Sequence, residues 1–417
     1  MSEQGTPEPG GRGLVGRRGL LAAGGALGAL GALSTAAPAM AWTWQPSGSV
    51  VGTGEGADPR WVWDEVADPL VGSLLDSGAV PRVNELLREW TTNGQDLPKG
   101  LPTELRDFIE EARRKPDWAD PRKLDLAYRF NEKRGLYLGV LYGMASGMMS
   151  TVIPKEARAV YHSYGGANMK DRITKTAKLG YDIGTPNAYA DDGSMIVTCV
   201  KTRLTHAGVR NLLPKSAQWS DVAPEDIPIS QADMMVTWHS LATTVNRKMV
   251  EWNVPIPPEE SEAYLHSWQL CAHMLGIADE YIPASWEQAN LQADQVLTPI
   301  LAPTAEGVNL ADILMDFGKE IDGSILSRPV IGALTRFMLG DQVARWLMIP
   351  DEPIWDPLLN TLWGPFIAVR EGLLQNFPGS QQAYWTFDEV LRQAVLLFLS
   401  RGDYPISISI PTGNRPG

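Results

Sequence analysis

Between residues 155 and 210 the chain carries four side chains whose chemistries complement one another. Glu156 supplies a carboxylate and Arg172 a guanidinium, while Lys175 supplies an amine and His206 an imidazole. A neutral imidazole can ligate iron, an amine can do so once it is deprotonated, and a carboxylate can accept a proton. Together these groups could serve chemistry at a haem iron.

The spacing of these residues favours a shared site. Arg172, Lys175 and Thr176 stand at positions i, i+3 and i+4, so they share one face of a helix. His206 follows a segment with helical character and is one of only five histidines. Each residue also has an ordinary interpretation: a hydrogen-bonded histidine, a solvated lysine, or a glutamate that favours the dipole of a first helical turn.

The same residues carry a resemblance to a known family. Glu156, the sequence Arg172-x-x-Lys175-Thr176 and His206, placed behind a twin-arginine export signal, resemble the latex clearing proteins. These are secreted rubber oxygenases of actinobacteria, and they belong to a broader oxygenase family that shares their haem-binding domain. The resemblance extends over most of the mature chain.

The resemblance implies a role for each of these residues. His206 would be the proximal ligand of a b-type haem iron, and Lys175 would lie on the distal side, where it could occupy or vacate the sixth position. Glu156 would be the general base, its pKa raised by desolvation in an apolar pocket. Arg172 and Thr176 would position Glu156, a haem propionate or bound oxygen, although either could equally be a surface residue.

The remaining histidines have two interpretations. His239, His266 and His273 fall where the latex clearing proteins carry histidines, and we expect hydrogen-bonded core residues that stabilise the haem domain. A non-haem metal site is the alternative, because Glu262 and His266 are four residues apart. The chain departs from some relatives at Asn211, where they carry another histidine shortly after the haem ligand.

Composition sets the class of protein. The chain has 417 residues, 44% hydrophobic and 20% charged, which is ordinary for one large globular domain or two smaller ones. A net charge of -13 argues against nucleic acid or an anionic membrane as a partner. Period-2 alternation is scarce apart from residues 406–410, so we predict an all-α fold. The resemblance implies a globin-like helical bundle enclosing a b-type haem.

The N-terminus carries an export signal. Arg17 and Arg18 precede an apolar run rich in glycine and alanine, and Ala39-Met40-Ala41 supplies small residues for cleavage. The twin arginine and weak hydrophobicity favour the Tat route, which exports folded protein and suits a cofactor loaded in the cytoplasm. We therefore expect a secreted, extracellular protein.

Four segments follow from these signals. Residues 1–41 form the twin-arginine (Tat) signal peptide, and residues 42–60 form a flexible lead-in rich in glycine, serine and proline. The resemblance implies that residues 61–401 form the helical haem-binding oxygenase domain. Residues 402–417 form a C-terminal tail that we expect to be poorly structured.

Helices within the domain are predicted from apolar periodicity and capping signals. An amphipathic helix follows Pro102-Thr103, and Ser230 with Asp233 forms a capping box that starts another helix. Further helices are expected from near residue 258, over residues 309–322, 329–348 and 359–377, and from a cap at Thr386 to Leu399.

An uncharged stretch from Gly135 to Pro154 has two interpretations. Gly139, Gly143 and Gly147 repeat every fourth residue, which is typical of a transmembrane packing face. We favour a buried helix, whose glycines let a neighbouring helix or a haem plane approach closely, because glycines and serines lower its hydrophobicity.

The two cysteines limit how a haem could be attached to the chain. Cys199 and Cys271 could form one disulfide bridge or remain two buried thiols. The sequence has no C-x-x-C-H motif, so haem would not be covalently attached.

The resemblance implies a secreted haem b dioxygenase that cleaves double bonds of poly(cis-1,4-isoprene), natural rubber, with dioxygen as co-substrate. The products would be oligoisoprenoids with aldehyde and ketone ends. Expected partners are the polymer and the Tat machinery, with no nucleic acid and no stable membrane insertion, and a monomer is expected. The alternatives are a haem oxygenase acting on a small terpenoid or lipid, a non-enzymatic extracytoplasmic haem protein, and a haem-free lipid-binding protein.

Overall fold

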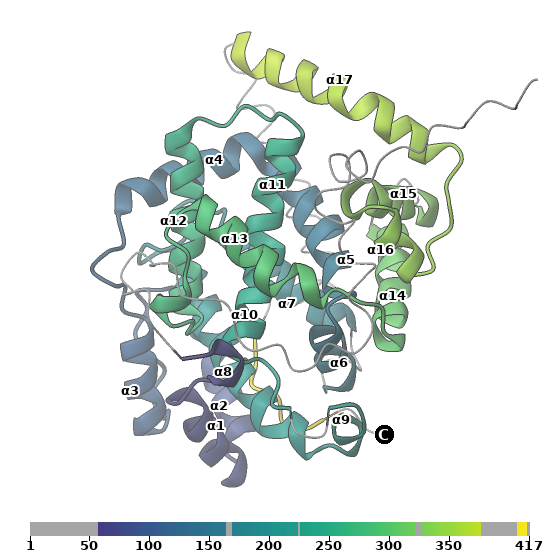
Figure 1. Ribbon diagram of the computed structural model, residues 1–417. Coiled ribbons are helices and arrows are strands. Elements are labelled where there is room, and N and C mark those ends of the chain that lie inside the picture. Colours follow the sequence, from purple (N-terminus) through teal and green to yellow (C-terminus); the bar gives the residue numbers. More distant parts are fainter. Residues whose placement is uncertain (1–56, 164–168, 224–225, 322–326, 377–406, 415–417) are drawn as a thin grey trace, which may run out of the picture. The chain divides into compact units, whose positions relative to one another are not determined.

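All regular secondary structure in the described part of the chain is helical (Figure 1). The only pairing between extended residues in that part is an isolated bridge between Ser163 and Asn414. This confirms the all-α prediction, while a globin-like bundle around a haem stays a prediction. The computed structural model describes residues 57–163, 169–223, 226–321, 327–376 and 407–414.

The helices occur in the following order along the chain. In the first half they are η2 (Pro59–Trp61), α1 (Ala67–Asp76), α2 (Val80–Leu87), α3 (Thr103–Ala112), α4 (Pro121–Val140), η3 (Leu141–Ser146), α5 (Gly147–Ser150), α6 (Pro154–His162), α7 (Met169–Asp182), α8 (Met195–Leu212), η5 (Leu213–Lys215) and α9 (Ala217–Val222). In the second half they are α10 (Gln231–Trp238), η6 (His239–Thr243), α11 (Thr244–Glu251), α12 (Pro258–Met274), η7 (Asp279–Tyr281), α13 (Trp286–Val296), η8 (Thr298–Ile300), α14 (Ala305–Ile321), α15 (Arg328–Leu339), α16 (Asp341–Trp346) and α17 (Trp355–Asn376).

Local sequence signals predicted several of these helices. The amphipathic pattern after residue 102 corresponds to α3, and the capping box of Ser230 and Asp233 is formed at the start of α10. The single helix predicted over residues 329–348 is wrong. Gly340 separates α15 from α16 with a φ of 87°, a left-handed conformation that glycine adopts without a steric penalty. The helix predicted over residues 386–399 lies outside the described residues.

The glycine-rich stretch forms the end of α4, the π-helical η3 and α5. Tyr137, Leu141 and Met148 are buried, which confirms an interior helix. An added Cβ at Gly139 or Gly143 would meet no heavy atom within 4 Å, so the predicted close approach of a neighbouring helix is wrong there. In the described chain no one helix has the length and apolarity of a membrane span. Two helical stretches meeting at 88°, residues 121–150 and 154–162, satisfy these criteria only as a pair.

The core forms where α12 packs along α4. The rings of Phe130 and Tyr264 lie 4.8 Å apart across this contact, and the indole N–H of Trp238 donates to the Trp268 carbonyl at 2.9 Å. Burying aromatic rings removes large apolar areas from water, which stabilises this layer of helices. Trp238 and Trp268, two of the chain's 15 tryptophans, are therefore part of the core.

The two π-helical segments lie against each other. Ser146 in η3 donates its hydroxyl to the carbonyl of Ser240 in η6 at 2.7 Å. His239, the first residue of η6, is fully buried between Thr243 and Gln292, at 2.8 and 2.7 Å. Gln292 donates its amide to the carbonyl of Tyr281, so its oxygen faces the imidazole. The imidazole therefore carries a proton on Nε2, and burial, which lowers its pKa, keeps it neutral.

At both ends of the described domain, residues that we predicted to be flexible or poorly structured make specific contacts with the rest of the protein. In the lead-in that we predicted to be flexible, Ala57 accepts a hydrogen bond from Tyr281 at 2.7 Å and Asp58 caps η2. In the predicted tail, Ile408 and Ile410 are buried. Asn84 of α2 exchanges two hydrogen bonds with the backbone of Ile410, at 2.9 and 3.0 Å. A poorly structured tail is therefore the wrong description of residues 407–414.

The buried imidazole of His239 predicts acid sensitivity. Burial lowers its pKa to about 3, below the value of 6.5 in an unfolded chain, so the unfolded state binds the proton first. The free energy of unfolding should fall as the pH drops from about 6.5 towards 3, by up to about 1.4 kcal/mol per pH unit. Urea titrations across this range would measure the slope. His239→Gln should be less stable at neutral pH but have a shallower slope, and an unchanged slope would contradict the assignment.

Candidate functional site

His206 lies near the C-terminal end of α8, a helix buried along much of its length. The side chain is half-buried, and its Nδ1 atom is shielded from solvent. A helix holds an imidazole at a fixed angle, which a metal ligand requires. The environment of His206 is thus compatible with the predicted ligand role.

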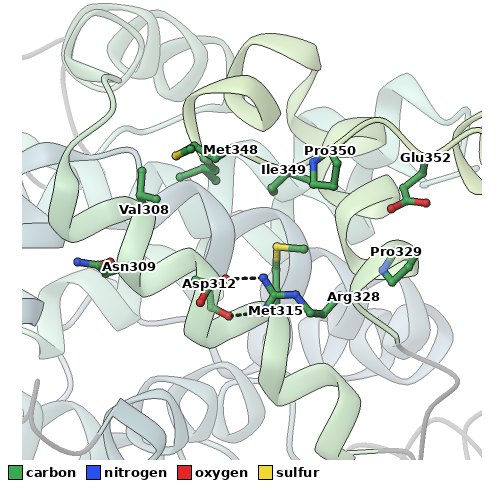
Figure 2. Close-up of a pocket in the computed structure, with 11 residues that line it drawn as sticks. Val308, Asn309, Asp312, Met315, Arg328, Pro329, Met348, Ile349, Pro350 and Glu352 are labelled. Atoms are coloured by element: carbon green, nitrogen blue, oxygen red, sulfur yellow. Dashed lines mark hydrogen bonds and ion pairs between the residues drawn. The ribbon is translucent and has the colours of Figure 1, made fainter.

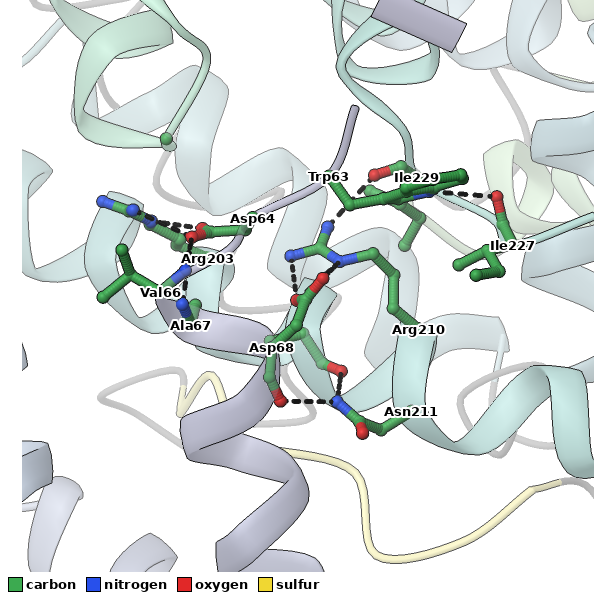
Figure 3. Close-up of polar contacts among 12 residues, drawn as sticks. Trp63, Asp64, Val66, Ala67, Asp68, Arg203, Arg210, Asn211, Ile227 and Ile229 are labelled. Carbon is green, nitrogen blue, oxygen red and sulfur yellow. Dashed lines mark hydrogen bonds and ion pairs between the residues drawn. The ribbon is translucent and has the colours of Figure 1, made fainter. Parts of the chain in front are cut away.

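Two ion pairs fix the orientation of α8 against α1 and the segment that precedes it (Figure 3). Arg203 contacts Asp64 at 2.5 and 3.0 Å, and Arg210 contacts Asp68 at 2.7 Å. Arg203 precedes His206 by three residues and Arg210 follows it by four, so the ion pairs lie on the turns that flank the imidazole. Rotation of α8 about its axis would break both pairs, which holds the direction of His206.

Asn211 strengthens the same contact (Figure 3). Its amide donates to the carbonyls of Asp68 and Ala207, both at 2.9 Å. Gly72 on α1 makes room for it, because an added Cβ there would lie 2.8 Å from the Asn211 oxygen. The residue that departs from some relatives therefore joins α8 to α1.

The pKa values of the two aspartates are shifted in opposite directions. Burial raises the pKa of both carboxyls, but Arg203 and the N–H of Ala67 outweigh burial at Asp64, whose pKa lies below its usual value. At Asp68 burial outweighs the contact with Arg210, and the pKa lies above its usual value. Asp64 consequently keeps its charge at a more acidic pH than Asp68.

The predicted distal residues lie on α7, which packs against α8. Lys175 is half-buried and Thr176 is exposed, whereas the side chain of Arg172 lies outside the described side chains. One turn further on, Lys178 pairs with Asp182, and both contact Thr198 of α8, at 3.1 and 2.5 Å. This network fastens the helix of Lys175 to the helix of His206.

Glu156 lies in the first turn of α6, which Pro154 begins. It is half-buried, and its carboxylate accepts a hydrogen bond from the hydroxyl of Thr237 on α10 at 3.3 Å. The neighbouring Lys155 pairs with Asp226 at 2.8 Å and with Asp233 at 2.9 Å. The start of α6 is therefore held against the start of α10, with Glu156 beside this contact.

Sequence reasoning missed two polar residues near these helices. Thr237 stands four residues after Asp233, but only the packing of α6 on α10 shows that it contacts Glu156. Lys201 is buried on α8 and donates to the carbonyl of Trp90 at 2.7 Å. Burial, with the charge of Lys178, lowers the pKa of Lys201 to about 7. No local pattern marks either residue.

His239, His266 and His273 are hydrogen-bonded, as predicted, and His162 also has a partner, because its Nε2 atom lies 3.3 Å from the carboxylate of Glu306. His239 contacts Thr243 and Gln292, as described above. His266 accepts the backbone N–H of Asp120 at 2.9 Å, and His273 lies 2.7 Å from the carboxylate of Asp279. Among the described residues, no group of three or more His, Cys, Asp or Glu side chains could hold a metal ion. Cys199 and Cys271 are both buried free thiols.

A cavity of about 460 Å³ lies between α14, α15 and the turn after α16 (Figure 2). Arg328 reaches Asp312 at its edge, and the sulfur-bearing side chains of Met315 and Met348 line it. None of its lining residues is one of the predicted site residues. The cavity is therefore separate from the residues that sequence analysis singled out.

Comparison with known proteins defines the class. Residues 133–368 match the family described as ER-bound oxygenase mpaB/B'/Rubber oxygenase, catalytic domain. This chain belongs to that family and is an oxygenase.

Two individual proteins are similar to this chain over most of its length. The chain is 55% identical to the protein named Rubber oxygenase from Streptomyces sp. (strain K30) over 376 residues, which cover 90% of this chain and 92% of that protein. The solved structure of Latex Clearing Protein LCP in the closed state superposes with a TM-score of 0.80 and 55% identity, covering 89% of this chain and 99% of that one. The resemblance seen in the sequence is confirmed.

The ion pairs that hold α8 can be tested by stability. Asp64→Asn should lower the free energy of unfolding by about 3 kcal/mol, because it leaves the half-buried guanidinium of Arg203 without its charged partner. Glu85→Gln breaks the exposed pair with Arg82 and should cost about 0.5 kcal/mol or less. Urea unfolding followed by circular dichroism measures both. Equal losses would show that the Arg203 pair does not hold α8.

Proposed function

We propose that this protein is a secreted haem b dioxygenase that cleaves double bonds of poly(cis-1,4-isoprene) to oligoisoprenoids with aldehyde and ketone ends. The observation that carries the proposal is 55% identity to a rubber oxygenase across nearly the whole length of both chains. Glu156, Lys175 and His206, which the resemblance singles out, lie on α6, α7 and α8. Dioxygen is the co-substrate of the proposed reaction.

The donor groups on α7 and α8 suit a haem. His206 on α8 and Lys175 on α7, two packed helices, would hold the haem through its iron with an imidazole and an amine. Gly139 and Gly143 leave an uncovered helix surface, and α7 contacts η3, the segment that contains Gly143. A flat ring could approach such a surface without meeting side chains. When bound, the haem would supply an iron centre that activates dioxygen.

His206 would be the proximal ligand. Its imidazole would bind the iron from α8, with the ion pairs of Arg203 and Arg210 holding its direction. Lys175 would act from α7 by occupying or vacating the sixth position, and only its deprotonated amine can bind iron. The contacts of Lys178 with Asp182 and Thr198 would limit how far this part of α7 can move.

Glu156 would be the general base. Its carboxylate would take an allylic proton from the isoprene unit as the C–H electron pair forms a new double bond and the electrons of the original double bond bind oxygen, or it would otherwise steer oxygen onto the alkene. The hydroxyl of Thr237 would hold the carboxylate in position. The ion pairs of Lys155 with Asp226 and Asp233 would keep the first turn of α6 in place during this step. Arg172 and Thr176 would position the carboxylate, a haem propionate or oxygen from α7.

The substrate would be recognised by apolar contact alone. Polyisoprene has no charge and no hydrogen-bonding group, so its affinity must come from area removed from water. At about 25 cal/mol per Å², a few buried isoprene units would contribute several kcal/mol before ordering costs.

The polymer is too large to enter a cell, which accords with an extracellular enzyme. We propose export through the Tat route on the twin arginine at residues 17–18 and the apolar run that follows. The enzyme would act as a monomer, with neither nucleic acid nor stable membrane insertion.

Removing the proposed ligand should remove the cofactor. His206→Ala, expressed in haem-replete cells, should lose most of the Soret absorbance because the imidazole is the protein's strongest link to the iron. His273→Gln is the matched control, since its imidazole contacts Asp279 and should leave the haem in place. A full Soret band in His206→Ala would exclude His206 as the ligand.

The proposed base can be separated from haem binding. Glu156→Gln should keep its haem but lower oxygen uptake on polyisoprene by about 10²-fold or more, because a general base contributes at least that factor. Thr237→Val should lower the rate less, by about tenfold, because it removes one hydrogen bond to a charged carboxylate. Glu262→Gln, on an exposed part of α12, should retain the wild-type rate. A wild-type rate in Glu156→Gln would exclude it as the base.

A further inference from the structure

The helix α17 is fastened to the protein by its inner face. The ring of Trp363 lies 4.9 Å from that of Trp252 and 5.8 Å from that of Phe337. Nearer the end of the helix, the buried carboxylate of Glu371 accepts hydrogen bonds from Arg134 at 2.8 Å and from Tyr137 at 2.9 Å. These contacts give α17 the tertiary packing that a stable helix needs.

The opposite side of α17 is also apolar, and it is exposed. Apolar residues spaced four, four and three apart line one side, with Leu362 51% and Val369 63% exposed. We call this set the outer stripe: Leu358, Leu362, Phe366 and Val369. A surface helix ordinarily presents charged and polar groups on its solvent face, so an exposed apolar stripe indicates a binding surface.

The outer stripe lacks charge. Residues 357–369 contain no Asp, Glu, Lys, Arg or His, in a chain whose net charge is -13. The polar side chains beside the stripe donate hydrogen bonds to the backbone of their own helix. Asn360 donates to the Asp356 carbonyl at 2.8 Å, and Thr361 donates to the Pro357 carbonyl at 2.7 Å. This surface therefore presents few groups that could pair with a charge or form a hydrogen bond with a partner.

We propose that the outer stripe is the face with which this protein docks on the surface of particulate polyisoprene, an inference that rests on the proposed function. A hydrocarbon surface is uncharged and cannot form hydrogen bonds, so it matches a face without ionisable groups. A protein partner would be expected to have a polar rim with hydrogen bonds across it. Docking would hold the enzyme on the particle while a polymer chain reaches the site.

Adsorption measured without turnover tests the proposal. Purified full-length protein would be sedimented with dispersed synthetic poly(cis-1,4-isoprene) particles, and the unbound fraction measured. Leu362→Glu and Leu362→Lys should each weaken adsorption by about tenfold, because losing the burial of one leucine changes affinity by about that factor. Leu291→Glu on α13 is the matched control, since Leu291 is 58% exposed and lies outside the stripe. It should adsorb as the wild type does.

Oxygen uptake on a short, detergent-dispersed oligoisoprene separates docking from catalysis, and the Leu362 variants should keep the wild-type rate there. A wild-type protein inactive on both substrates would overturn the proposed function, whereas unchanged adsorption of active Leu362 variants would overturn only the docking face. Weaker adsorption of Leu362→Glu with unchanged adsorption of Leu362→Lys would also overturn the docking face. The effect would then come from the added negative charge and not from the lost apolar contact. A marked fall in melting temperature, or a smaller oligomer by sedimentation, would show instead that protein covers the stripe.

Discussion

Two buried guanidinium groups on α8 must find carboxylates, and much of the arrangement depends on that requirement. A buried charge without a partner costs several kcal/mol, so Arg203 and Arg210 can be accommodated only where Asp64 and Asp68 meet them. Because both pairs lie on turns flanking His206, the same contacts set the direction of the imidazole. Packing of α7 on α8 then brings the helix of Lys175 to the same region.

Features that depend on neighbouring residues could be predicted from the sequence. The apolar spacing of α3 and the capping box of α10 each involve residues within about one or two helical turns, so the sequence pattern contains the cause. The broken helix at Gly340 was missed because apolar periodicity continues across it, and only the backbone conformation reveals the break. Residue types and family spacing drew attention to His206, Lys175 and Glu156, whose roles remain predictions.

Contacts between distant segments could not be predicted in this way. Thr237 is hydrogen-bonded to Glu156, which lies 81 positions away in the sequence. Asn84 is hydrogen-bonded to Ile410, which lies 326 positions away. Such pairs arise from the packing of whole helices, and no local pattern encodes them. For the same reason we predicted a poorly structured tail, whereas residues 407–414 cover α8. An added Cβ at Gly208 would lie 2.6 Å from Pro411.

The central claim is that α8 presents an imidazole to a porphyrin iron. The most direct measurement is the absorption spectrum of the purified protein from haem-replete cells, quantified as the pyridine haemochrome. The account predicts a b-type spectrum with about one haem per chain, since one proximal histidine can hold one iron. Protein that is folded and pure but contains no iron porphyrin would contradict it.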